Sequence, residues 1–414
     1  MRVLQVYNNY RSGGGGEAVV VTQTKDILQK HGHSVRMLER DSRTIVTLRH
    51  KMAAFANGLY SWQAKREMAD IIEKDRPDVV HVHNLYPLFS PSVLVACRQQ
   101  SIPVVMTLHN YALTCPELRH LRAGAVCQRC LGGREHWCVL HNCRGNIFES
   151  LGYALRAASS RKLGLFVDNV TLFIALTNFA KHRLLNAGFE DHHIVVIPNA
   201  VSLPESPVDP STGAYAAFVG RLSSEKGISA LLIAACSTGL PVRIAGDGPM
   251  GPLLARQAPK NVEFVGKLDR MAIRTFYRSA RFIIVPSKCF EGFPLVIAES
   301  MSHGVPVIAS KIGGLPEIVE DGVTGILFEP GNAEDLAAKM QLLWENPDLC
   351  RQMGLAGRQK VMREYTEDMY FQNLITVYQT AIQRSRNRAV VMPLVHINNA
   401  VLPLNETGKS CGKG

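Results

Sequence analysis

Short apolar runs alternate with stretches of helical spacing along most of the chain. The runs at 2–8 and 77–84, for example, are followed by segments whose apolar residues recur every three or four positions. Short buried strands joined by helices are typical of a parallel sheet that is covered by helices on both faces. In the first half we expect strands at 2–8, 34–40, 77–84, 103–110, 170–177 and 192–201, with helices at 17–32 and 90–100.

A segment rich in Pro, Ser and Asp interrupts this pattern at 201–213 and is typical of a linker. The alternation then resumes, with strands expected at 214–220, 241–248, 261–267, 281–287, 305–310 and 325–330. We therefore predict an α/β fold of two Rossmann-like, doubly wound domains, at 1–200 and 214–364, which face a central cleft. Ligands of such folds lie at the carboxyl ends of the strands.

The regular pattern ends with a helix expected at 365–385, which we expect to pack back on the N-terminal domain. Residues 386–414 mix apolar residues with Asn, Gly and Lys. We expect these last residues to form a poorly ordered tail.

Composition and charge limit the classes of partner. The chain has 414 residues, of which 46% are hydrophobic and 20% charged, as in ordinary globular proteins. No apolar run reaches the roughly 18 residues of a membrane helix, and the N-terminus lacks the apolar core of a signal peptide. We therefore expect a cytoplasmic protein, and association with the inner face of the membrane is compatible with this expectation. The net charge of +11 favours anionic partners, but no nucleic-acid-binding pattern is present, so we expect no nucleic acid.

Two loops between a strand and a helix are candidates for phosphate binding. Arg221 and Lys226 lie in the loop after the strand at 214–220, where two cations can hold one diphosphate. A glycine run follows the first strand, so that the backbone can approach a ligand and the next helix can present its amides. The alternatives are a solvated basic loop and a flexible turn. The glycine run consists of Gly13, Gly14, Gly15 and Gly16.

The stretch CFEGFPLVIAES, at 289–300, places two carboxylates after an expected strand. Glu291 lies in a loop kinked by Gly-Phe-Pro, and Glu299 lies about one turn into the helix expected at 295–304. Both side chains can face the cleft, where the helix N-terminus favours an anion. A carboxylate near a helix N-terminus is also stabilised without any ligand, so each glutamate alone fits a structural role equally well.

Two histidines, His81 and His83, alternate near the end of the strand expected at 77–84. One of them can face the cleft. The interpretation that we favour is that both are buried or cap the strand.

Taken together, the motifs of the second half resemble family 4 of the retaining glycosyltransferases, which have the GT-B fold. In the first half, GGGGE, HVHN and TLHNY occur in the order expected for that family, and the resemblance extends to about residue 385. The resemblance is to members found in bacterial polysaccharide biosynthesis. It implies that this chain transfers a sugar, typically a hexose, from a nucleotide-diphospho-sugar to a glycan or lipid-linked glycan. The motifs of the second half are GRLSSEKG, AGDGP, CFEGFPLVIAES and VPVIASKIGGLPEIVEDGVTGILFEPGN.

The resemblance implies a role for each candidate residue. Arg221 and Lys226 would bind the diphosphate, and Glu291 would hold hydroxyls of the donor sugar. Glu299 would accept hydrogen bonds from the ribose, and His109, at the end of the strand at 103–110, would contact the donor sugar. The residues expected to be catalytic are Glu291, His109, Arg221 and Lys226. Those expected to bind substrate are Gly13, Gly14, Gly15, Gly16, Gly246, Asp247, Gly248, Gly266, Gly292, Phe293, Pro294, Leu295 and Glu299.

The resemblance also implies that catalysis requires no cofactor. Arg, Lys and helix N-terminal amides can stabilise the charge of a leaving diphosphate without a metal. No Asp-x-Asp motif occurs where a metal–diphosphate bridge would be expected. The alternatives are another GT-B enzyme, such as a sugar-nucleotide epimerase or a disaccharide synthase, and a non-catalytic nucleotide-sugar-binding protein.

A cysteine-rich insert is expected at about 112–165 in the N-terminal domain. Cys127 and Cys130 form a C-x2-C pair, and Cys138 and Cys143 would complete a tetrahedral, structural zinc site. The alternative is a cluster of free thiols, since a cytosolic chain favours reduced cysteines.

The insert is also basic, with apolar residues interleaved among its charges. Between 115 and 165, eight Arg and Lys stand against three Glu, which gives 8 − 3 = +5. Such a patch fits an anionic membrane surface. The alternative is a solvated face with a buried apolar stripe.

Overall fold

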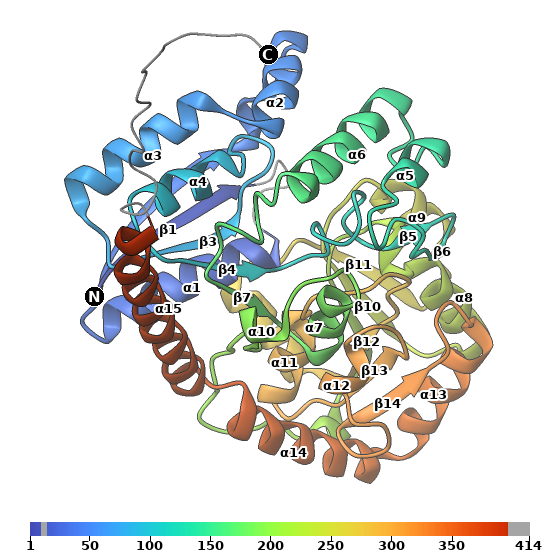
Figure 1. Cartoon of the computed structure of the whole chain (residues 1–414). Helices are drawn as coiled ribbons and strands as arrows, with labels where there is room; N and C mark the ends of the chain where they lie inside the picture. The colour runs from blue at the N-terminus through green and yellow to red at the C-terminus, as the bar shows by residue number, and fades with distance from the viewer. Residues whose placement is uncertain (10–14, 396–414) are drawn as a thin grey trace, which may run out of the picture.

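The computed structural model describes residues 1–9 and 15–395, which form two α/β halves (Figure 1). Each half is built on a six-stranded parallel sheet, so the predicted fold class of two doubly wound units is confirmed. The strand order is β2-β1-β3-β4-β7-β8 in the first sheet and β11-β10-β9-β12-β13-β14 in the second. Across the described ranges, no helix is both long enough and apolar enough to span a lipid bilayer.

Every strand that the apolar runs predict is present. Strands β3, β7 and β13 are buried at every position, because helices cover both faces of each sheet. The first sheet contains β1 (Arg2–Asn9), β2 (Ser34–Asp41), β3 (Val79–Asn84), β4 (Val104–Leu108), β7 (Leu172–Ala175) and β8 (Ile194–Val196). The second contains β9 (Tyr215–Val219), β10 (Val242–Ala245), β11 (Val262–Gly266), β12 (Ala280–Val285), β13 (Val307–Ser310) and β14 (Gly325–Phe328).

Helices connect the strands, and the insert adds a small hairpin of β5 (Leu121–Arg122) and β6 (Ala125–Val126). Neither this hairpin nor helices α2, α3, α5, α6 and α7 were among the elements predicted from the sequence. The helices of the first half are α1 (Gly16–Lys30), α2 (Leu48–Leu59), α3 (Trp62–Asp75), α4 (Ser92–Gln99), α5 (His136–Leu140), α6 (Ile147–Lys162) and α7 (Asn178–Leu185). Those that follow are α8 (Ile228–Thr238), α9 (Gly251–Gln257), α10 (Arg270–Arg278), α11 (Leu295–Ser302), α12 (Leu315–Ile318), α13 (Ala333–Glu345), α14 (Pro347–Glu364) and α15 (Glu367–Val395).

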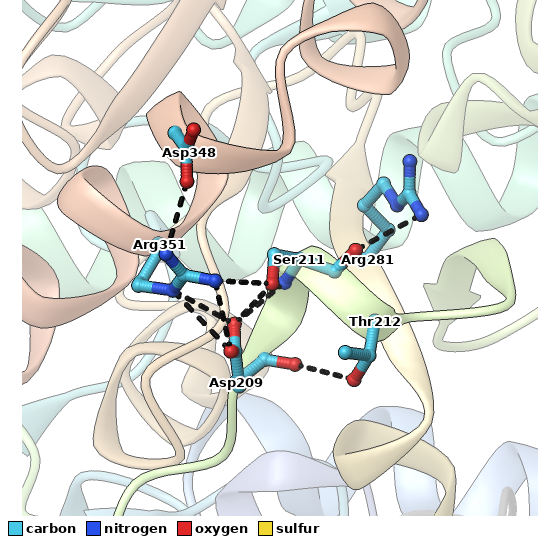
Figure 2. A network of polar contacts seen from close by, with 6 residues as sticks. All are labelled: Asp209, Ser211, Thr212, Arg281, Asp348 and Arg351. Carbon is cyan, nitrogen blue, oxygen red and sulfur yellow. Dashed lines mark hydrogen bonds and ion pairs between the residues drawn. The ribbon is translucent and has the colours of Figure 1, made fainter.

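The segment between the halves is anchored to the second half at its end. Figure 2 shows Asp209 and Ser211 bonded to Arg351 of α14, with an Asp209–Arg351 ion pair at 3.1 Å. The guanidinium of Arg281 also donates to the backbone carbonyl of Ser211. These contacts fix where the chain enters β9.

The last helix, α15, lies against the first half of the chain (Figure 1). Leu374 and Tyr378 pack in one core cluster with Val79 and Val105 of the first sheet. The helix does not end near 385 as expected but continues to Val395, since no Gly or Pro interrupts 386–392. The rest of the expected tail, 396–414, lies outside the described residues.

A buried histidine joins α15 to the first sheet. The hydroxyl of Tyr378 lies 2.7 Å from Nδ1 of His81, and Nε2 of His81 lies 2.8 Å from Oγ1 of Thr107. A neutral imidazole satisfies both bonds, one as acceptor and one as donor. Burial lowers the pKa of His81 to about 3, with a smaller contribution from His109. His83 is also buried, so the structure places both histidines as we favoured.

We expect the free energy of unfolding to fall as the pH drops from about 6.5 towards 4, since the unfolded chain then binds protons that buried His81 does not. At pH 5 the loss is up to about 2 kcal/mol for one such histidine. Chemical unfolding at pH 7 and pH 5 measures it. His81→Asn should make the dependence shallower, whereas His182→Asn, at an exposed position, should not. An unchanged dependence in His81→Asn would contradict this assignment.

Candidate active site

A lysine and a glutamate meet at the carboxyl edge of the second sheet. Nζ of Lys226 lies 2.7 Å from Oε1 of Glu291, and Oγ of Ser287 donates to the same oxygen at 2.6 Å. The side chains of Lys226 and Glu291 are only 27% and 14% exposed, so the pair is partly shielded from water. Burial favours the neutral amine, but the carboxylate of Glu291 outweighs burial and raises the pKa of Lys226. Lys226 is therefore a cation at neutral pH.

Backbone contacts hold the two loops of this pair together. Gly227, at φ +70°, packs against the end of β12, where a Cβ would lie 1.8 Å from the carbonyl oxygen of Pro286. Only glycine fits this close approach with a left-handed backbone. The amide of Lys288 also donates to the carbonyl of Glu225 at 2.8 Å. Lys226 is thus placed by the backbone on either side of it.

The remaining candidate residues of this edge lie on the loops after β9, β10 and β11. Arg221 is exposed and makes no ion pair with any residue that the structure describes. The amide of Leu222 donates to the carbonyl of Asp247 at 2.7 Å, and the amide of Gly246 donates to the carbonyl of Gly266 at 2.8 Å. The GDG loop, which includes Gly248, is therefore joined to both neighbouring loops.

Helix α11 begins beside the Lys226–Glu291 pair. Pro294 occupies the position before its first residue, as expected for a residue that has no amide to donate. Phe293 and Leu295 are buried, so their contribution to a ligand site is through the backbone. Glu299, half-buried one turn further on, accepts a hydrogen bond from the hydroxyl of Tyr277 at 2.8 Å. Tyr277 was not among the predicted residues.

The first half supplies the opposite wall. A Cβ at Gly292 would lie 2.7 Å from the carbonyl oxygen of His109, so the two halves nearly touch there. The hydroxyl of Tyr111 donates to the carbonyl of Glu291 at 2.9 Å. Nε2 of His109 lies 3.0 Å from Nδ1 of His83, and burial lowers the pKa of His109 to about 4. His109 is therefore a neutral imidazole at the cleft; Tyr111 and His83 were not predicted as site residues.

The glycine run contributes only in part to the described structure. Gly13 and Gly14 lie outside the described residues, whereas Gly15 caps α1 and Gly16 begins it. A Cβ at Gly16 would lie 3.6 Å from Cδ1 of Leu295, so α1 begins opposite α11. Gly15 and Gly16 therefore border the same cleft.

Glu17, directly after the glycines, is a further carboxyl group that the sequence analysis did not single out. Its Oε1 atom is buried without a hydrogen-bond partner in the described structure. Burial raises the pKa of Glu17 to about 8, against the opposing effect of a bond with Asn84. The signal was present in GGGGE, but a single acid after glycines has no spacing that distinguishes it from a helix-start charge.

The cysteine-rich insert brings several cysteines so close together that Cys143 adds to the effect of burial in raising the pKa values of the Cys130 and Cys138 thiols. With Zn–S bonds of about 2.3 Å, the sulfurs of a tetrahedral site lie within about 4 Å of one another. Among the described residues, the ligand atoms of three potential ligands lie within 4.8 Å of one another only at an exposed turn with Glu190, His192 and His193. The nine described cysteines are all free thiols. The four expected to bind zinc are Cys127, Cys130, Cys138 and Cys143, and zinc binding by them stays a prediction.

The insert nevertheless reaches the Lys226 loop. Arg119 lies 3.2 Å from Oε1 of Glu225, next to Lys226, and forms a second ion pair with Glu117. The ring of His120 packs on Phe290, with 5.5 Å between centroids. The insert is therefore part of the wall of the cleft.

Two family models match the chain, one after the other. Residues 14–204 match the model described as Glycosyltransferase Family 4, and residues 203–360 match that described as Glycosyl transferases group 1. Among curated proteins, a glycosyltransferase of uncharacterized activity from Methanocaldococcus jannaschii is 26% identical over 70% of this chain and 72% of its own.

Two solved structures with a similar fold each align with 92% of this chain. Sucrose-phosphate synthase from Thermosynechococcus elongatus has a TM-score of 0.70 and 18% identity, and is covered over 99% of its length. The Anabaena protein HepE, solved in complex with UDP-glucose, has a TM-score of 0.64 and 18% identity, and is covered completely (100%). At such identities the likeness shows the fold, whereas the two family models together span residues 14–360. The chain therefore belongs to glycosyltransferase family 4 and is a sugar-transferring enzyme of the GT-B fold.

Proposed function

We propose that the chain moves a sugar from a nucleotide-diphospho-sugar to a glycan or lipid-linked glycan, with retention at the anomeric carbon and without a catalytic metal. The observation that carries the proposal is the charged pair of Lys226 and Glu291, 2.7 Å apart at the carboxyl edge of the second sheet. A cation for the leaving diphosphate and a carboxylate for the sugar stand side by side there. Such a pair is what this transfer requires.

The donor side of the reaction follows from these positions. The bond between the anomeric carbon and the β-phosphate oxygen breaks, and the nucleoside diphosphate leaves with its electron pair. Lys226 and the exposed, unpaired Arg221 stabilise that charge, together with the amides at the start of α11. Glu291 holds the donor sugar and stabilises positive charge on it; it is not a nucleophile here.

The acceptor hydroxyl attacks the anomeric carbon from the face that the diphosphate leaves. Its proton passes to the leaving phosphate oxygen, so that the overall step is balanced without another base. Neutral His109 lies on the opposite wall from Glu291 and can orient the donor sugar as a hydrogen-bond donor.

A pocket between the first sheet and the insert is the proposed acceptor site. It has apolar walls, among them Phe166 and Phe189, and the cationic side chain of Arg156. Leu113 and Thr114 line this pocket and also a smaller one that Gly292 closes, so the acceptor would approach Glu291 from the first half. Glu135 also lines the pocket but is paired with Arg161, so Arg156 supplies a cation in a mostly apolar lining, which suits a glycan that carries a phosphate-linked lipid.

UDP-glucose is the first donor to test, because the Anabaena neighbour was solved with it. A panel of UDP-, GDP- and ADP-sugars should identify at least one donor from which nucleotide is released. Glu291→Gln and Lys226→Ala should each lower kcat/KM by about 10²–10³, the usual effect of removing one electrostatic stabiliser. Release of nucleotide measures the rate, and addition of EDTA should leave it unchanged.

Matched changes at the end of α3, Glu73→Gln and Lys74→Ala, should leave the rate as it is, since both side chains are exposed where the helix leads to the amino end of β3. Identification of the product by NMR separates the alternatives: a new glycosidic bond with the donor's anomeric configuration supports the proposal, whereas an epimer of the donor contradicts it. If no nucleotide sugar binds, the chain is not the transferase that we propose.

Structural zinc in the insert stays a prediction that metal analysis can test. Zinc binding would require the four sulfurs to move together, which would give about one zinc per purified chain. In that case Cys127→Ser should lower the zinc content, whereas Cys236→Ser, at an exposed position on α8, should not. Less than about 0.1 zinc per chain would leave free thiols as the correct interpretation.

A further inference from the structure

Helix α6 has its large and small side chains on unexpected sides. Phe148, Leu151 and Leu155 follow one another at helical spacing, yet they are 79%, 42% and 45% exposed. The buried face of α6 instead carries Ser150, Gly152, Ala154 and Ser160. In a surface helix of a globular protein the large apolar stripe normally faces the core. On α6 this stripe faces outwards.

Helix α2 extends the same apolar surface. Met52 and Phe55 are 66% and 47% exposed, and α2 lies next to α6 on the first half (Figure 1). The ring of Phe55 covers Gly152, where a Cβ would lie 2.4 Å from Cε2. The small residues of α6 therefore allow α2 to approach. We call the combined surface the α2–α6 face; its large apolar side chains are Met52, Phe55, Ile147, Phe148, Leu151 and Leu155.

Basic residues predominate in the segments that form the α2–α6 face. No acidic residue occurs between 42 and 66, where Arg43, Arg49, Lys51, Lys65 and Arg66 stand. In the insert, two of the three glutamates are buried in ion pairs, Glu117 with Arg119 and Glu135 with Arg161. Glu149 is thus the one exposed carboxylate of the insert. Basic residues therefore outnumber acidic ones in α2 and in the insert, although Arg43 is paired with Asp41.

We propose that the α2–α6 face binds an anionic lipid bilayer. Apolar side chains that enter the interface and basic residues that face lipid phosphates are the two components of peripheral membrane binding. A protein partner with an acidic rim, or a second copy of this chain, would need a complementary anionic surface. Among the described residues of α6 the one exposed carboxylate is Glu149, so a second copy would bring mainly cations against cations.

The α2–α6 face and the pocket proposed for the acceptor share helix α6, which is consistent with an acceptor that is reached at a membrane surface. Arg156, Ser160 and Arg161 of α6 line the pocket proposed for the acceptor, while Leu151 and Leu155 point away from the core on the same helix. An α6 that rests on a bilayer would thus place the pocket at the lipid headgroups. This step rests on the proposed function, since it assumes a lipid-linked acceptor.

Vesicle flotation tests the proposal with the full chain. The chain should float with vesicles of phosphatidylcholine and phosphatidylglycerol, and much less with phosphatidylcholine alone or at high salt. The double variant Phe148→Ser, Leu151→Ser should lower binding to anionic vesicles by about 10-fold or more, since it removes buried apolar area at the interface. Both side chains are exposed, so the fold should be unaffected.

The matched control changes two exposed apolar residues of α14, Leu355→Ser and Met362→Ser, and should float like the parent chain. The proposal is overturned if the parent chain does not float, or if the α6 variant floats equally well. It is also overturned if light scattering finds a dimer that the α6 variant dissociates. Nucleotide release from the donor panel does not depend on vesicles, so a failure of the transferase proposal and a failure of membrane binding give different results.

Discussion

The two halves of the molecule depend on one close contact at Gly292. A side chain there would overlap the carbonyl oxygen of His109, so any larger residue would push the Glu291 loop away from β4. The hydroxyl of Tyr111 then fixes the carbonyl of Glu291 from the first half, while Lys226 and Ser287 fix its carboxylate from the second. The position of Glu291 is thus set from both sides of the cleft. The Lys226–Glu291 pair belongs to the second half, and the first half holds the backbone of Glu291 in place.

Further contacts that cross between the halves support this junction. The rings of Tyr111, Phe179 and Phe290 pack edge to face, with 4.7 Å between the centroids of the last two. Glu317 of α12 accepts a hydrogen bond from the amide of Asn178 at 2.7 Å, and so caps α7 across the boundary. The boundary between the halves is therefore stabilised both by packing of aromatic rings and by a charged cap on α7. We infer that these contacts stabilise the arrangement of the cleft in which Lys226 meets Glu291.

The sequence was sufficient for the sheets and for much of the site, because both leave local signals. Buried parallel strands appear as apolar runs, and the loops after them contain the glycines and charges. The pairing of Lys226 with Glu291 leaves no local signal, since the two residues are 65 positions apart. Tyr277 and His83 were missed for a related reason. A single tyrosine on a helix or histidine on a strand has no spacing that separates a ligand contact from a core position.

Helix α6 shows where periodicity alone is insufficient. Its stripe of Phe148, Leu151 and Leu155 has the spacing that predicts a core-facing helix, and only the tertiary contacts reveal that the stripe faces solvent. An exposed phenylalanine contributes little to the free energy of folding, because it stays in water in both states. Apolar surface of this kind is more often explained by binding than by folding. The inward-facing Gly152 serves a different purpose: it lets α2 approach, so that Phe55 and Met52 widen the same surface.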